Sequence, residues 1–450
     1  MNGNRNLKRR DGFAAFAGSG SAATAAIESM RVLWFTHLPL DAVNRHFGRP
    51  TTGTGFWIHS LVSPLIESGR VDLAIVTATA GDPPYRFTES GVKYFNIPQN
   101  KFLEVFGLFG GYRRNGYLRE AASIIEAWKP DIIHVHGTER FFGLVRARNL
   151  TRVPTVVSIQ TIMAEYARWA WGSMAWGDIL RNTTLWELSR NATMPADAYR
   201  HWRQACVERQ ILNSMDGVLG RTAWDRSHVR LINPSVPYFH VDDMMRPEFR
   251  LTEPWSLQSV RRGSLITTSS PGAAKGVAVL LRALHALRRW GHDVRLKIAG
   301  VSRVTGRRAS DRYLFKLVDD LELDGVVEFL GWCEAKELVD HQRQSHCFVT
   351  PSFIENGCNA LSEAQLLGMP CVASHAGGLT TTIRDGQTGL LFSRGDPAML
   401  AAKVEAVLLD DGLAVKIGAA ARVDAQLRHE PARIVSALLD AYHRVAQTRQ

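Results

Sequence analysis

The stretch PSFIENGCNALSEAQLLGMPCVASHAGG, residues 351–378, has the pattern of a strand end, a polar loop, a helix and a second strand. The apolar run HCFVTPS (346–352) leads into it and predicts a buried strand. Asn359 is predicted to be the N-cap of a helix over 360–367, and Gly368 is predicted to end that helix. The loop and the helix start therefore lie at the carboxyl end of a strand, where open α/β sheets bind ligands.

The polar residues of this stretch suit a nucleotide sugar. The free amides of Ala360 and Leu361 would bind an anion at the helix start. Glu363, one turn into the helix, is placed to accept hydrogen bonds from a diol such as ribose, and Glu355 is placed to hold the hydroxyls of a sugar. Taken singly, Glu363 is equally explained as a surface acid that stabilises the helix dipole, and Glu355 as an ordinary loop charge. Together with Lys275 they favour a ligand site.

Lys275 lies in a second loop of the same type, SSPGAAKG (269–276), between an apolar run and a helix that begins near Val277. Small residues let the backbone approach a ligand, and a lysine beside free helix amides suits a phosphate. The loop lacks the GxxxxGK[ST] pattern of a P-loop. Alone, it is equally consistent with a Gly/Ser turn and a solvated lysine.

The same order of apolar run, turn and amphipathic helix recurs along the whole chain. Nearly continuous apolar runs indicate parallel strands that are buried on both faces. We expect them at 31–38, 71–78, 131–137, 155–160 and 217–222, and then at 264–270, 294–300, 326–332, 346–352, 371–375 and 390–392. This alternation predicts an α/β protein with two doubly wound Rossmann-like domains that face each other across a cleft.

The domain limits follow from a stretch without a clear period, at about 238–262. We expect an N-terminal domain over 30–250, a C-terminal domain over 251–428 and a C-terminal helix over 429–450. Whether that helix crosses back to the N-terminal domain stays open. Residues 1–29 are basic and then rich in Gly, Ala and Ser, which indicates a disordered tail, or sequence upstream of a start at Met30.

Composition narrows the class of protein. The chain has 450 residues and a net charge of +11, which fits nucleic-acid binding, association with an anionic membrane, or attraction of a phosphorylated substrate. No nucleic-acid-binding signature accompanies the charge. The five cysteines are scattered and show no metal-binding spacing, so we expect reduced thiols and no metal site.

These motifs resemble the retaining glycosyltransferases of the GT-B fold in glycosyltransferase family 4, also called group 1. The resemblance runs from about residue 30 to beyond residue 392. It rests on Glu355 and Glu363 as an E-x7-E motif, the KG at 275–276, LKIAG, PDIIHVHG (130–137), TGTGFWIHSL (52–61), SIQ and GRTAWDR (220–226).

The resemblance implies a role for individual residues. Glu355 would contact the donor sugar, Glu363 the ribose and Lys275 the diphosphate. His136, the second histidine of HVHG, would face the reacting sugar, and Gly55 would let its loop approach the diphosphate or the acceptor. His134 is expected to be a core residue.

One position departs from the family. The arginine that often lies five residues before the KG lysine is Ser270 here. Neutralisation of the phosphates would then depend on Lys275, the helix amides and Arg221 of GRTAWDR. Because the chain has no D-x-D motif, we expect metal-independent transfer. The resemblance further implies that the donor phosphate takes the proton of the acceptor and that no covalent intermediate forms.

The implied function is transfer of a sugar from a nucleotide-diphosphate sugar to a carbohydrate or lipid-linked acceptor, in polysaccharide or glycoconjugate biosynthesis. No cofactor and no nucleic-acid partner are expected. Two alternatives stay open: a nucleotide-sugar epimerase of the same fold and, with less support, a basic RNA-binding protein.

The tryptophan-rich segment 162–186 leaves the location open. Four tryptophans with few charges fit either a membrane interface or the wall of an acceptor site. We expect a cytoplasmic protein. Whether it binds peripherally to the inner face of the membrane stays open.

Overall fold

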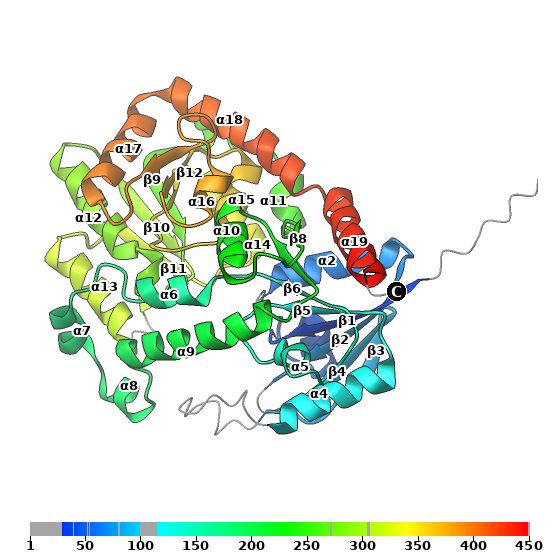
Figure 1. Cartoon of the computed structure of the whole chain (residues 1–450). Helices are drawn as coiled ribbons and strands as arrows, with labels where there is room; N and C mark the ends of the chain where they lie inside the picture. Colours follow the sequence, from blue (N-terminus) through cyan, green and yellow to red (C-terminus); the bar gives the residue numbers. More distant parts are fainter. Residues whose placement is uncertain are drawn as a thin grey trace, which may run out of the picture.

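The computed structural model describes residues 29–448, except for residues 39, 52, 54, 80, 81, 100–114, 271 and 304–306. The tail expected over residues 1–29 lies outside the described residues, apart from Ser29. The chain folds into two α/β domains, each built on a parallel sheet, as predicted (Figure 1). Over the described part of the chain, no helix combines the length and the apolar character needed to cross a bilayer.

The first sheet has eight strands in the order β3-β4-β2-β1-β5-β6-β7-β8, and only β3 and β4 pair antiparallel. The strands are β1 Met30–Thr36, β2 Val71–Thr77, β3 Arg86–Glu89, β4 Val92–Asn96, β5 Ile132–His136, β6 Thr155–Ser158, β7 Gly217–Gly220 and β8 Tyr238–His240. The five predicted strands are confirmed as β1, β2, β5, β6 and β7. The sequence did not predict β3, β4 and β8, because these strands are short or do not form a continuous buried run.

Nine helices are described ahead of β8 in the chain. They are α1 Asp41–His46, α2 Phe56–Glu67, α4 Asn115–Trp128, α5 Leu144–Ala147, α6 Met163–Trp169, α7 Trp176–Asn182, α8 Leu185–Ser189, α9 Met194–Leu212 and α10 Ala223–Ile232.

The second sheet is wholly parallel, in the order β11-β10-β9-β12-β13-β14. The strands are β9 Arg261–Thr268, β10 Arg295–Ala299, β11 Val327–Gly331, β12 Ser345–Thr350, β13 Cys371–Ser374 and β14 Leu390–Phe392. All six were predicted. The described helices that follow β8 are α11 Pro247–Leu251, α12 Val277–Arg289, α13 Ala309–Asp320, α14 Ala335–Arg343, α15 Asn359–Leu367, α16 Leu379–Thr382, α17 Pro397–Leu409, α18 Asp411–Arg428 and α19 Pro431–Gln447.

The chain passes between the domains twice. At the first passage, Met244 packs in a core of the first domain, whereas Met245 and Phe249 pack in the core of the second. The chain thus enters the second domain at about residue 245. The domain boundary was expected slightly later, at residue 251. No regular element was predicted in the stretch 238–262, but it contains β8, α11 and the start of β9. These elements were missed because the buried residues of the stretch follow no helical or strand period.

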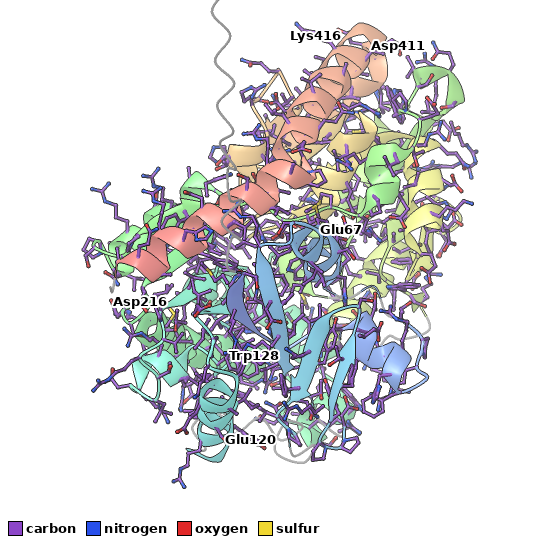
Figure 2. All side chains as sticks on the ribbon, turned by 90° about the vertical axis from the view of Figure 1, so that its right-hand side faces the viewer. Glu67, Glu120, Trp128, Asp216, Asp411 and Lys416 are labelled. Carbon is purple, nitrogen blue, oxygen red and sulfur yellow. The ribbon has the colours of Figure 1, made fainter. Side chains whose placement is uncertain are left out.

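The second passage leads from α18 to α19, which returns to the first domain. Figure 2 shows both helices as one diagonal, from the end marked by Asp411 and Lys416 to the first sheet. Tyr442 of α19 is fully buried, and its hydroxyl oxygen accepts a hydrogen bond from Trp34 Nε1 of β1 at 2.9 Å. The C-terminal helix therefore completes the core of the N-terminal domain.

Candidate active site

The loops after two adjacent strands, β9 and β12, meet at the carboxyl edge of the second sheet. Lys275 Nζ from the first loop lies 2.6 Å from Glu355 Oε1 in the second. The same oxygen accepts a hydrogen bond from Ser352 Oγ at 2.9 Å. Among the described residues, Glu355 Oε2 has no hydrogen-bond partner, so it is the oxygen that a ligand hydroxyl can reach. The structure thus brings together two residues that are 80 positions apart in the sequence.

The charge of Lys275 is maintained by this pair. Burial opposes the charged ammonium, but the nearby Glu355 carboxylate outweighs burial and raises the pKa of Lys275 above its usual value. Lys275 is therefore a fixed cation over the whole physiological pH range.

Two close backbone approaches fix the positions of these loops. Gly276 has a φ of +72°, and a Cβ atom there would lie 2.0 Å from the carbonyl oxygen of Pro351. Gly377 has a φ of +52°, and a Cβ atom there would lie 2.0 Å from the carbonyl oxygen of Glu355. The amide of Gly378 donates a hydrogen bond to the same oxygen at 2.9 Å. The glycine pair at 377–378 therefore holds the loop that carries Glu355.

The start of α15 differs from the prediction at one residue. Asn359 is the first residue of the helix and Cys358 is the N-cap residue, so the prediction of Asn359 as N-cap is wrong. Asn359 and the half-buried Asp243 instead help to line one cavity of about 220 Å³. The side chain of Cys358 makes no capping hydrogen bond to the start of α15, where Ala360 is half-buried.

Glu363 lies deeper than the sequence suggested. Its side chain is 2% exposed, and its two carboxylate oxygens accept hydrogen bonds from Arg246 Nε and Nη2, at 2.7 and 2.8 Å. Burial raises the pKa of Glu363, while Arg246 acts in the opposite direction. Arg246 also lies over the ring of Phe56, next to Gly55 on the first domain. Both carboxylate oxygens of Glu363 are therefore engaged by Arg246. The sequence analysis missed Arg246 because it lies in the stretch without a period.

Arg221, expected near the phosphates, is engaged within the protein. Its Nη1 lies 2.5 Å from Asp243 Oδ1, and its Nη2 donates to Gln160 Oε1 at 3.2 Å. Its Nε packs beside Gly357 of the Glu355 loop and has no hydrogen-bond partner among the described residues. Arg221 thus connects the first domain to the loop that carries Glu355, and Asp243 and Gln160 engage two of its five N–H donors.

The two histidines of HVHG differ in their contacts, and His134 is buried in the core as predicted. His134 bonds to the hydroxyl groups of Tyr442 and Ser158 at 2.7 and 2.6 Å, which makes it a core residue. His136 ends β5, and its buried Nε2 has no partner among the described residues. Burial lowers the pKa of His136 to about 3, so the imidazole is neutral at physiological pH. A neutral ring with one unused nitrogen can hydrogen-bond to a sugar hydroxyl.

Glu139, three residues after His136, is a further polar group that the sequence analysis did not select. Its Oε2 is buried and has no partner among the described residues. Burial raises the pKa of this carboxyl to about 7. The HVHG motif drew attention to the histidine, but nothing in the sequence indicated that a charged residue in the following turn is buried.

Gly55 begins α2 in a left-handed conformation, with φ +76°. A Cβ atom there would lie 2.7 Å from Leu38 Cδ1, so this position requires glycine. Its neighbour Gly53 lies beside the ring of Trp332 on the second domain. The loop that contains Gly53 and Gly55 therefore lies at the interface between the two domains.

The structure also brings together three possible metal ligands that the sequence analysis did not select. Cys333, Glu337 and His341 present ligand atoms within 4.8 Å of one another. Their spacing of four residues is not a familiar cysteine motif, so it was missed. Lys297 Nζ lies 3.3 Å from His341 Nδ1, and this ammonium opposes the binding of a cation.

The tryptophan-rich segment splits into an inner and an outer part. Trp169 stacks on Phe353, just ahead of Glu355, with ring centroids 5.9 Å apart. Tyr166 and Gly272 help to line a cavity of about 80 Å³ between this segment and the loop of Lys275. The inner part therefore packs against the loops that carry Lys275 and Glu355, whereas Trp176 is exposed on the outside.

Comparison with known protein families places both domains. Residues 265–424 match the family described as Glycosyl transferases group 1, and residues 52–238 match the Glycosyl transferase 4-like domain.

Individual proteins agree with this placement. A D-inositol 3-phosphate glycosyltransferase of Pseudarthrobacter chlorophenolicus is 36% identical over 169 residues, which cover 38% of this chain and 40% of that relative. A protein of the same name from Xylanimonas cellulosilytica is 24% identical over 88% of this chain and 93% of its own.

Solved structures share the fold. Sucrose-phosphate synthase from Thermosynechococcus elongatus superposes with a TM-score of 0.69 at 16% identity, covering 93% of this chain and all of that chain. Anabaena HepE, in complex with UDP and glucose, gives 0.63 at 14% identity, with 91% and 98% coverage.

Proposed function

The chain belongs to the group 1 glycosyltransferases, and from this premise we propose that it transfers a sugar from a nucleotide-diphosphate sugar to a hydroxyl group of a saccharide or lipid-linked acceptor. The observation that carries this proposal is the 2.6 Å pair of Lys275 and Glu355 beside the start of α15. A cation and helix amides suit the diphosphate, and an adjacent carboxylate suits the hydroxyls of the sugar.

The donor that we propose to test first is a uridine diphosphate sugar, because HepE was solved with UDP and glucose. The relatives named D-inositol 3-phosphate glycosyltransferase make a phosphorylated polyol the first acceptor to test beside saccharides and lipid-linked sugars. Polysaccharide or glycoconjugate synthesis is the process in which such a transfer belongs.

The proposed transfer retains the anomeric configuration and uses no metal. Lys275 and the first amides of α15 would stabilise the negative charge that develops on the leaving diphosphate. The donor phosphate would accept the proton of the acceptor hydroxyl on the same face, so Glu355 would position the sugar and not attack it. His136 would hold a hydroxyl of the reacting sugar through Nε2.

A thermal-shift panel of UDP-, GDP-, ADP- and dTDP-sugars tests the donor. A ligand that binds only the folded protein, at about 100 times its dissociation constant, adds about 2.7 kcal/mol to the free energy of unfolding. If none of these sugars raises the melting temperature, the proposed site is contradicted.

Incubation with the stabilising sugar, with and without acceptors, then tests the reaction. We expect consumption of the donor only when an acceptor is present, with the transferred sugar in its original anomeric configuration. Conversion of the donor to an isomer without acceptor would show an epimerase instead.

A further inference from the structure

Large hydrophobic side chains are exposed on the arm formed by residues 174–203, whose inner side packs against the second domain. Figure 1 shows α7, α8 and the beginning of α9, which make up this arm, at one corner of the molecule. Six of the sixteen large hydrophobic residues that are exposed in the described part of the chain lie here. They are Trp176, Leu180, Leu185, Leu188, Tyr199 and Trp202, and each is more than half exposed, with Leu185 at 84%.

Arginines accompany these apolar residues. Arg181, Arg190 and Arg203 form no ion pair within the described residues. Arg190 lies 5.0 Å from the ring centroid of Trp186, and Arg203 lies over Tyr199 and donates to its hydroxyl at 3.3 Å. The outer surface of the arm is therefore both apolar and cationic.

The arm contains three acidic residues, Asp178, Glu187 and Asp197, and two of them are engaged by other groups. Glu187 is 1% exposed, and its Oε1 accepts a hydrogen bond from the amide of Ala309 on the second domain at 3.0 Å. Asp197 forms ion pairs with Arg200 and Arg308. Asp178 alone is neither buried nor in an ion pair with a described residue, so Arg181, Arg190 and Arg203 outnumber the remaining carboxylate of the arm.

The inner side of the arm is anchored. Ile179 and Met194 are buried in the core of the second domain, and Thr184 Oγ1 donates to the carbonyl oxygen of Arg307 at 3.0 Å. Because the inner side is held by packing and hydrogen bonds, the outer side is presented in a fixed conformation. The exposed leucines and tryptophans of the outer side therefore lie outside the packed core of the monomer.

We propose that the outer surface of residues 174–203 binds an anionic lipid membrane. Exposed leucines can enter the acyl boundary, tryptophan and tyrosine favour the interface, and arginines are attracted to anionic head groups. A symmetric contact between two copies would bring the arginines of one arm close to those of the other, and like charges oppose such a contact. A membrane with negative lipids is complementary to both properties of the surface.

Vesicle flotation with the full chain, without donor or acceptor, tests this proposal. We compare neutral phosphatidylcholine vesicles with vesicles that contain about 30% phosphatidylglycerol. The wild-type protein is expected to float with the anionic vesicles, and the double substitution Leu185→Ser, Leu188→Ser is expected to weaken its partitioning about tenfold or more.

A charge variant provides a second measurement with unchanged apolar residues. Arg181→Gln with Arg190→Gln is expected to weaken binding to anionic vesicles roughly tenfold at low salt and to remove the preference over neutral vesicles. Leu409→Ser is the matched control, because Leu409 is 71% exposed on α17 in the other domain and lies outside the arm. It should bind like the wild type.

Absence of wild-type binding to anionic vesicles would overturn the proposal, as would equal binding by the wild type and both arm variants. A wild-type dimer that the Leu185→Ser, Leu188→Ser variant dissociates would overturn it in favour of a second copy. Since no substrate is present, each of these results is independent of the proposed transfer reaction.

Discussion

Lys275 and Glu355 join the two loops that follow β9 and β12, through a contact of 2.6 Å between Nζ and Oε1. The side chains are 27% and 12% exposed, so the pair is shielded from water and yet accessible from one side. The ammonium is thereby positioned before any ligand arrives. Preorganised charge of this kind is what a departing diphosphate needs.

Lys275→Met is expected to weaken binding of the nucleotide sugar by about 30-fold or more. The substitution removes a phosphate contact and leaves the Glu355 carboxylate without its partner. Lys275→Arg, which keeps the charge, should retain part of the affinity. Lys403→Met is a matched control, since Lys403 lies on α17 beside Asp385. Titration by calorimetry measures all three, and wild-type affinity in Lys275→Met would contradict the assignment.

Chelation provides a separate prediction about the leaving group. If Lys275 and the first amides of α15 stabilise the diphosphate, EDTA should leave most of the transferase activity in place. The assay measures initial rates with and without EDTA, at fixed ionic strength because charge contacts depend on salt. Complete inactivation that Mg²⁺ or Mn²⁺ reverses would show that a cation takes part.

The sequence predicted the positions of Lys275 and Glu355 because both follow apolar runs that read clearly as buried parallel strands. Carboxyl ends of such strands lie along one edge of a sheet, so two polar loops there are expected to meet. The direct contact depends on β9 and β12 being neighbours, which the sequence order alone does not give.

Contacts from the irregular stretch at 238–262 could not be predicted. Arg246 reaches Glu363, and Asp243 reaches Arg221, only because the chain crosses between the domains at this point. Such contacts depend on tertiary structure and leave no local period. The assignment of Asn359 as an N-cap was wrong because the helix begins at Asn359 itself, one residue earlier than predicted.

His136→Ala is expected to lower the rate about 100-fold or more, the size typical for an oriented polar group at a reacting centre. Nucleotide binding should be unchanged. Because the pKa of His136 is about 3, the ring is already neutral at pH 5, and the shape of the pH–rate profile between pH 5 and 9 should not change. Loss of an acidic limb in the variant would show that a protonated His136 takes part.

Glu363→Gln is expected to lower both stability and donor affinity. It leaves the guanidinium of Arg246 without a carboxylate in a largely buried position, and breaking such a pair costs about 3–5 kcal/mol. Arg246→Met breaks the same pair but keeps the carboxylate for a ribose. It should therefore lower the melting temperature and affect donor affinity less. Equal losses of donor affinity in the two variants would argue against a contact between Glu363 and the nucleoside.

Glu208→Gln is expected to stabilise the protein at alkaline pH. Glu208 is buried on α9, where its Oε1 accepts a hydrogen bond from the Met163 amide at 3.0 Å and Oε2 lies 2.5 Å from Thr138 Oγ1. Burial raises the pKa of this carboxyl from 4.5 to about 8.

The direction of the effect follows from proton binding. Between pH 4.5 and 8 the folded protein keeps the proton of Glu208, while the unfolded chain releases it. The stability that this proton contributes is fully present below pH 4.5 and is lost as pH rises to about 8, by about 1.4 kcal/mol per pH unit. Glutamine resembles the protonated acid and does not titrate, so the variant should lose less stability over this range.

Melting temperatures of the two proteins should be similar near pH 5 and should separate by pH 8, with the variant higher. A variant that melts lower than the wild type by the same margin at both pH values would show that Glu208 is ionised in the folded protein.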